Sequence, residues 1–302
     1  MMSLAAETRS ILQAHGLHPR KALGQNFLAD RAVLEDIVRA AGVGPGETVV
    51  EVGPGVGTLT GALLESGADV TAVELDERLA AVVRSRFSEN VRLRIVEANI
   101  LHVDMATILP ASKRYYLVAN IPYYITAPII RLFLEEETPP EVMVLMVQRE
   151  VAERLAATPG RLSILGVMAQ YYAQVDIVQI VPASAFVPPP DVDSAVVRLR
   201  PYRTTLLPRD DAERFFALVK AGFGEKRKQI HNALVRGLAH IPAAEIDAAL
   251  REVHIERTRR AETVSLEEWG ALFGALEPRL PAKPKNDHRG DALPPIKVRG
   301  GR

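Results

Sequence analysis

A glycine-rich turn between a strand-like run and a helix-like run constrains the fold most. Residues 49–60 read VVEVGPGVGTLT, with glycines at positions 53, 55 and 57. Glycine permits positive φ and close approach of a ligand, and a helix N-terminus presents unpaired amides. The order strand, turn and helix therefore predicts a nucleotide-sized pocket, although any doubly wound domain has a glycine turn after its first strand.

The spacing of the glycines narrows the choice of nucleotide. Position 58 is Thr58, so the G-x-G-x-x-G dinucleotide pattern is broken, and no Gly-Lys-Ser/Thr follows to grip a phosphate. Glu51 precedes the turn, and Glu74 ends an apolar run about twenty residues later, where it can bind ribose hydroxyls. This combination suits S-adenosylmethionine (SAM), with Gly53 and Gly55 approaching the cofactor.

Composition limits the remaining classes of function. The 302 residues are 48% hydrophobic and 25% charged, the formal net charge is zero, and cysteine is absent. Disulfides, thiolate nucleophiles and cysteine zinc sites are therefore excluded, and the seven histidines show no metal-ligand grouping. No apolar run approaches the roughly 18 residues that span a bilayer, and the N-terminus lacks a signal-peptide core. We expect a cytoplasmic protein without a metal or a membrane partner.

Alternating runs predict an α/β fold with a mainly parallel sheet and helices on both faces. Strand-like runs lie at 49–52, 70–73, 93–96, 115–119 and 142–147, and helix-like runs lie at 59–66, 77–86 and 129–136. Ligands bind such sheets beyond the carboxyl ends of the strands. Gly53, Glu74, Asn99 and Asn120 each follow a strand-like run, so we expect them on one edge.

The N-terminal part predicts a helix over 4–15 and a second helix over 31–41 with Asp30 as N-cap. The intervening segment 19–28 has neither period. It is either a solvated connection anchored by Phe27 and Leu28 or a lid across the glycine turn.

Asn120-Ile121-Pro122-Tyr123 predicts the chemical centre. The Asn120 side-chain oxygen and the next backbone carbonyl can each accept one N–H of an adenine amine, which favours a tetrahedral nitrogen with a free lone pair. Pro122 stiffens the turn, and Tyr123 can lie on the face of the base. Such positioning supplies up to roughly 7–11 kcal/mol of a barrier. The plain alternative is an ordinary turn after a strand.

Three prolines at 188–190 follow Phe186 and predict a stiff, extended segment. This segment either holds Phe186 opposite Tyr123 across a base or places Phe186 in the core.

Helical texture with more basic residues begins near position 204. Lys226, Arg227 and Lys228 form a basic turn that suits phosphate contacts, and 257–260 adds a second basic cluster. For the isolated triplet at 226–228, a solvated helix face is the more common alternative. Residues 277–302 predict a disordered basic tail. We thus expect a cofactor domain over 1–203, a small helical RNA-contacting domain over 204–276 and the tail.

Together these motifs make the chain resemble the ribosomal RNA adenine N6-dimethyltransferases, in particular those of the small subunit. The resemblance covers about residues 21–272. It rests on LGQNFL at 23–28, VEVGPGVGTLT at 50–60, AVELD at 72–76, NIPYYI at 120–125, FVPPPDVDSAVVRL at 186–199 and GFGEKRKQIHNAL at 222–234.

The resemblance implies a class I SAM-dependent methyltransferase domain with a small all-α C-terminal domain. It implies dimethylation of two adjacent adenosines in the 3′-terminal hairpin of small-subunit (16S) rRNA, on the immature 30S subunit. We also expect the protein to act as a monomer. By position, Asn26, Leu28 and Gly53 line the cofactor site, and Glu74 binds the ribose. Asn120 holds the target amine, with Tyr123 and Phe186 around the base.

Asn99 departs from the family, which has Asp there to accept a hydrogen bond from the cofactor's adenine amine. An Asn oxygen still accepts that bond without charge assistance, so we expect weaker SAM binding. Two alternative functions stay open. One is a large-subunit rRNA dimethyltransferase of the macrolide-resistance type, and the other is a non-catalytic RNA- or DNA-binding assembly factor. A small-molecule methyltransferase is disfavoured by the basic C-terminal part.

Overall fold

A computed structural model describes residues 2–20, 24–110, 114–225 and 227–281. Its helices are α1 (Leu4–Ala14), α2 (Arg31–Ala41), α3 (Thr58–Glu65), α4 (Glu77–Arg86), α5 (Thr126–Glu135), α6 (Arg149–Leu155), α7 (Ile164–Tyr172), α8 (Ala212–Phe223), α9 (Ile230–Gly237), α10 (Ala243–Glu252) and α11 (Leu266–Leu276). Its strands are β1 (Phe27–Leu28), β2 (Thr48–Val52), β3 (Asp69–Glu74), β4 (Leu93–Glu97), β5 (Tyr116–Asn120), β6 (Met143–Gln148), β7 (Ala173–Val181), β8 (Phe186–Val187) and β9 (Ser194–Pro201). Short 3₁₀ turns connect them, including η3 (Tyr123–Ile125) and η7 (Glu277–Arg279).

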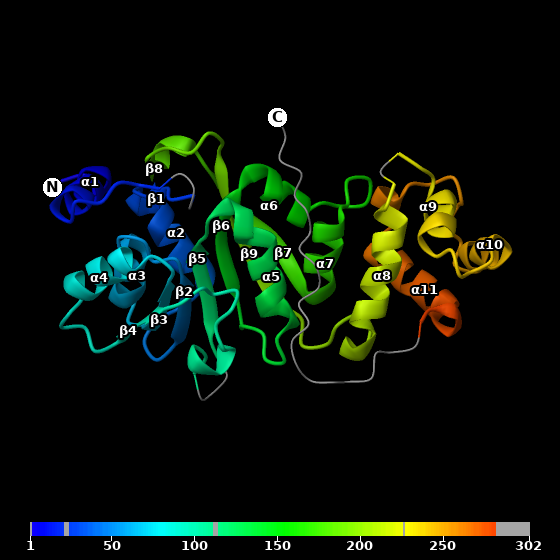
Figure 1. The fold of residues 1–302 in the computed structure, drawn as a ribbon, viewed down its shortest axis with the longest axis horizontal. Helices are drawn as coiled ribbons and strands as arrows, with labels where there is room; N and C mark the ends of the chain where they lie inside the picture. Colours follow the sequence, from blue (N-terminus) through cyan, green and yellow to red (C-terminus); the bar gives the residue numbers. More distant parts are fainter. Residues whose placement is uncertain (1, 21–23, 111–113, 226, 282–302) are drawn as a thin grey trace.

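Seven strands form the central sheet in the order β4-β3-β2-β5-β6-β9-β7 (Figure 1). Strands β2 to β6 run parallel, whereas β9 is antiparallel to both of its neighbours. The mainly parallel sheet predicted from the alternating runs is confirmed. The insertion of β9 between β6 and β7 was not predicted, since strand runs alone do not reveal spatial order.

The two faces of the sheet follow the alternation of side chains along its strands. Leu117 and Ala119 of β5 join the apolar cluster that contains α5 and α7, while Tyr116 and Val118 join the cluster that contains α2 and α3. Helices therefore cover both faces, as α/β layering requires.

Helices α8 to α11 pack beyond α7 at one end of the molecule (Figure 1). An aromatic cluster makes this junction: Phe215 of α8 stacks on Tyr171 of α7 with ring centroids 5.0 Å apart and touches Phe273 of α11 edge-on. The helical C-terminal part is thus confirmed, and it shares one apolar cluster with the sheet.

The ordered helical part extends past residue 276. Arg214 is buried, and its guanidinium donates to the Pro281 carbonyl at 2.8 Å, the Glu277 carbonyl at 2.7 Å and Glu277 Oε1 at 2.7 Å. Leu280 is also buried. The predicted tail is therefore corrected for 277–281, and its remainder, 282–302, lies outside the described residues.

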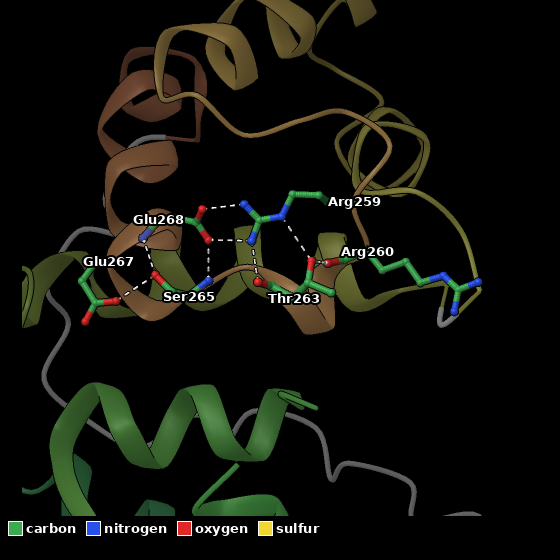
Figure 2. A network of polar contacts seen from close by, with 6 residues as sticks. All are labelled: Arg259, Arg260, Thr263, Ser265, Glu267 and Glu268. Atoms are coloured by element: carbon green, nitrogen blue, oxygen red, sulfur yellow. Dashed lines mark hydrogen bonds and ion pairs between the residues drawn. The ribbon is translucent and has the colours of Figure 1, made fainter. Parts of the chain in front are cut away.

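The second basic cluster has acidic partners, of which Figure 2 shows Glu268 beside Arg259. Arg259 forms a two-pronged ion pair with Glu268, at 2.5 and 2.8 Å, and Arg257 and Arg260 pair with Asp247 and Glu262 at 3.3 and 3.8 Å. Each of these arginines therefore has an acidic partner within the protein.

Candidate cofactor and base-binding site

A cavity opens at the carboxyl edge of the parallel strands, where the sequence predicts the site. Of the proposed cofactor and catalytic residues, all but one line it: Asn26, Leu28, Gly53, Gly55, Glu74, Asn99, Asn120 and Tyr123. The strand ends of β2, β3, β4 and β5 bring four of these positions together from distant parts of the chain, because parallel strands end at a common edge.

The glycine turn forms the floor of the cavity. Gly53 and Gly55 both adopt positive φ, at 70° and 60°. A Cβ on Gly55 would lie 2.9 Å from the Phe27 ring, so only glycine fits beneath that ring. Phe27 is itself buried and belongs to the segment that crosses the turn. The lid alternative for 19–28 is favoured for the described residues 24–28.

The pairing of β1 with β8 holds this lid in place. Phe27 faces Val187 and Leu28 faces Phe186 in an antiparallel register. Sequence reasoning missed this pairing, because two-residue strands leave no periodic signal.

Glu74 stands at the end of β3 with its carboxylate already oriented. Oε2 accepts the Gly55 amide at 3.1 Å, and Oε1 accepts the Asp76 amide at 2.9 Å. Burial raises the pKa of Glu74, and these backbone amides oppose the shift by favouring the charged form. The carboxylate keeps further lone pairs for hydroxyl donors. Because the Gly55 amide is used by Glu74, the turn does not offer that amide to a phosphate.

Asn120 has a fixed carboxamide orientation. Its Nδ2 donates to the Asn26 backbone carbonyl at 3.1 Å, and the Asn26 side chain donates in turn to the Gly24 carbonyl at 3.3 Å. This bond assigns the amide nitrogen to the lid and leaves Oδ1 as the acceptor on a residue that lines the cavity.

Asn99 is engaged on both sides of its amide. Oδ1 accepts the Leu101 amide at 3.0 Å, and Nδ2 lies 3.2 Å from Nδ1 of His102. The two contacts distinguish the oxygen from the nitrogen of the Asn99 amide. The oxygen keeps a second lone pair that can accept a hydrogen bond from a ligand amine.

The two aromatic residues predicted to enclose the base, Tyr123 and Phe186, differ in their position relative to the cavity. Tyr123 lines the cavity, and its hydroxyl lies 2.7 Å from Ser194 Oγ; burial raises its pKa. Phe186 does not line the cavity, and its side chain is 2% exposed in the apolar cluster on the α2 and α3 face. The core alternative for Phe186 therefore holds, because pairing with β1 turns its ring inward.

The basic turn lies between α8 and α9, away from the cavity. Arg227 and Lys228 are exposed there, whereas Lys226 falls outside the described residues. In Figure 1 this turn lies at the upper right and β1 and β8 lie at the upper left.

Sequence reasoning missed two residues that line the cavity, Asp76 and Tyr124, and one that contacts a lining residue, Ser194. Asp76 caps α4, lines the cavity and pairs with Arg78, which lowers the pKa of its carboxyl. Its position before a helical run carried the N-cap signal. Tyr124 lines the mouth, and Ser194 holds Tyr123; neither had a sequence signal apart from its neighbours.

Within the described ranges, no cluster of His, Asp and Glu suits a metal ion, and no helix has the length and apolarity to cross a bilayer.

Comparisons with known proteins agree with this geometry. A family model described as "Ribosomal RNA adenine dimethylase" matches residues 16–277. "Ribosomal RNA small subunit methyltransferase A" from Dehalococcoides mccartyi is 42% identical over 270 residues, 89% of this chain and 92% of that protein. The Enterococcus faecalis protein of that name is 39% identical over 91% of this chain and 96% of its own.

Two solved structures are similar in fold. A dimethyladenosine transferase from Plasmodium falciparum superposes with a TM-score of 0.73 at 26% identity, covering 84% of this chain and 98% of that one. The 23S rRNA methyltransferase ErmE superposes with a TM-score of 0.68 at 32% identity, covering 83% and 100%. The chain belongs to the ribosomal RNA adenine dimethylase family.

Proposed function

We propose that this protein uses SAM to dimethylate the N6 amines of two adjacent adenosines in the 3′-terminal hairpin of small-subunit (16S) rRNA, on the immature 30S particle. The observation that carries the proposal is the oriented amide of Asn120, whose nitrogen is held by Asn26 so that Oδ1 is the acceptor at the cavity. The high identity to proteins named for the small subunit supports the choice of RNA.

The cavity fits SAM rather than a dinucleotide. Glu74 offers a carboxylate for the ribose hydroxyls, the Asn99 oxygen offers an acceptor for the adenine amine, and the Gly55 amide is withheld from a phosphate by Glu74. Gly53 carries no side chain that could project toward the ligand beside Asn120, whereas Gly55 lies beneath the Phe27 ring. When bound, SAM supplies an activated methyl group on a sulfonium.

The residues of the chain position the target amine. The Oδ1 of Asn120 and the carbonyl of Ile121 each accept one N–H, which localises the nitrogen lone pair for attack. Tyr123, held by Ser194, lies against the base. No charged base is required, because the proton leaves to water after methyl transfer. Extruding the adenosine costs a few kcal/mol, least where it is already unpaired.

We also propose that the helical part over 204–281 contacts RNA. Arg227 and Lys228 are exposed and form no ion pair within the described part of the chain, unlike the arginines of 257–260. Phosphate contacts there would extend the RNA site away from the cavity. A single chain acting as a monomer stays a prediction.

A methylation assay with labelled SAM tests the function. Immature small subunits and large-subunit rRNA are offered separately, and the RNA is digested for mass spectrometry. We expect two dimethyladenosines in the small-subunit hairpin. Methylation of large-subunit rRNA alone would favour the macrolide-resistance type, and methylation of neither would favour an assembly factor.

Asn120→Ala is the site-directed test of the same proposal. Removing the oriented acceptor should lower the rate constant about 100-fold or more, since positioning of the amine is lost. Asn90→Ala is the matched control, because Asn90 caps a turn after α4 and does not line the cavity. Equal activity of Asn120→Ala and the wild type would overturn the assignment.

A further inference from the structure

The turn after β5 carries a tyrosine ring that the site described so far does not use. Tyr124 is 57% exposed and lines the mouth of the cavity. Its neighbour Tyr123 is half-buried with its hydroxyl tied to Ser194, and Phe186 is covered in the core. The open aromatic ring at this cavity therefore belongs to Tyr124.

The backbone that carries the Tyr124 ring is held by a hydrogen-bonded turn. Tyr124 is the central residue of η3, which is closed by a hydrogen bond from the Ile125 amide to the Pro122 carbonyl at 3.1 Å. Gly24 of the lid passes close by: a Cβ there would lie 3.3 Å from Pro122 Cβ and 3.8 Å from Tyr124 Cε1. The ring and the lid thus form one rim, which a flexible loop would not provide.

An exposed tyrosine ring at the mouth of a base-sized cavity suits a nucleobase. Bases stack on aromatic side chains irrespective of sequence, because every base has a π-face. The proposed substrate has two adjacent adenines, of which only one can occupy the cavity during a methyl transfer. The other remains at the mouth, where the ring lies.

We propose that Tyr124 stacks on the base next to the adenosine in the cavity and thereby positions the dinucleotide. This inference rests on the proposed function for the identity of the RNA, and it adds a specificity-determining contact outside the cofactor site. It also gives a physical reason for a second aromatic residue directly after Tyr123.

The test compares three variants: Tyr124→Ala, Tyr124→Phe and Tyr202→Ala. Tyr202 is the matched control, because its side chain is also exposed, at 44%. It follows the C-terminal end of β9, whereas Ser194, which contacts Tyr123, begins that strand. Affinity is measured for SAM and for a hairpin RNA with 2-aminopurine at either adenosine position, and KM and kcat are measured with immature subunits.

We expect Tyr124→Ala to weaken RNA binding roughly 5- to 100-fold and to raise KM, with SAM affinity unchanged. Tyr124→Phe should retain affinity and the fluorescence quenching that reports stacking, and Tyr202→Ala should behave as the wild type. Unchanged RNA affinity of Tyr124→Ala would overturn the inference. So would an equal loss in Tyr124→Phe, which would assign a hydroxyl contact to phosphate, or a loss of SAM affinity in Tyr124→Ala.

The proposed function can fail separately. If the wild type methylates only large-subunit rRNA, the same variants are assayed with a hairpin from that RNA, and stacking by Tyr124 is decided there.

Discussion

Glu51 is a buried acid at the base of the glycine turn. Its side chain is 0% exposed, Oε2 accepts the Thr60 hydroxyl at 2.7 Å, and Oε1 has no hydrogen-bond partner in the described part of the chain. Burial first, and then the charge of Glu74, raises the pKa of Glu51 to about 8, against the opposing hydrogen bond from Thr60. The native state therefore holds a proton that the unfolded chain releases near pH 4.5.

This proton makes stability depend on pH. Between about pH 5 and pH 8 the native state binds more protons than the unfolded state, so the contribution of Glu51 to the free energy of unfolding falls as pH rises. Glu51→Gln should remove that fall. Between about pH 5 and pH 8, we expect the free energy of unfolding of the variant to rise by a few kcal/mol relative to that of the wild type, measured by urea unfolding. Glu65→Gln, on the exposed side of α3, is the control; parallel profiles for Glu51→Gln and the wild type would contradict the prediction.

Asn99 sets the strength of one cofactor contact. Asn99→Asp should keep the bond from the Leu101 amide and add charge to the acceptor. We expect SAM to bind more tightly by about 1 kcal/mol, measured by titration calorimetry. Asn90→Asp controls for the added charge. Unchanged or weaker binding in Asn99→Asp would contradict the assignment of Asn99 to the adenine amine.

At the scale of elements, the start of α11 has a capping box. Ser265 accepts the Glu268 amide at 3.2 Å, and Glu268 accepts the Ser265 amide at 2.7 Å while also holding Arg259 (Figure 2). Arg259 lowers the pKa of Glu268, so the carboxylate stabilises the fold above its unfolded pKa and loses that effect as pH falls through the folded pKa.

Glu268→Gln should lower the free energy of unfolding by about 1 kcal/mol near neutral pH, discounted because the pair is about a third exposed. The difference should shrink as the solution is acidified below pH 4, measured by thermal unfolding. Glu267→Gln, one residue away and also near Ser265, is the control. If the difference in the free energy of unfolding between Glu268→Gln and the wild type did not depend on pH, the loss would come from the shape of the side chain and not from its charge.

Elements with a clear period could be predicted from the sequence, and elements defined by distant partners could not. Strands β2 to β6 and helices α2 to α4 lie within a few residues of their predicted ranges, since apolar spacing and caps are local signals. The pairing of β1 with β8 and the burial of Phe186 depend on residues about 160 positions apart. At the site, the strand-end positions were predictable from parallel topology, whereas the bond from Asn120 to Asn26 and the exposure of Tyr124 needed the lid in place.

At the scale of the whole molecule, one apolar cluster crosses the predicted boundary at residue 203. It contains Leu117 of β5, Tyr171 of α7, Phe215 of α8 and Trp269 of α11. A shared core couples the unfolding of the two parts, so the domains predicted over 1–203 and 204–276 are not independent in packing.

Phe215→Ala should lower the stability of both parts together, by about 3–5 kcal/mol, because its ring is fully buried at the junction. Fluorescence of Trp269, the single tryptophan, reports the helical part, and hydrogen exchange of β5 amides reports the sheet. Coincident transitions are expected in wild type and variant. Phe216 also contacts Tyr171 edge-on but is only partly buried, so Phe216→Leu is the control and should cost less stability. Two separated transitions would contradict a shared core.

The place of β9 in the sheet has a consequence for how the polypeptide is made. β7 leaves the ribosome before β9, yet β9 lies between it and β6. Of the seven-stranded sheet, a nascent chain that ends before Ser194 can assemble only β4, β3, β2, β5 and β6, with the apolar β6 exposed as an edge. β7 has no strand to pair with until all of β9, which ends at Pro201, has left the ribosome. Chaperones should therefore matter most for this partly synthesised chain, because the unpaired edge of β6 can pair with strands of other chains.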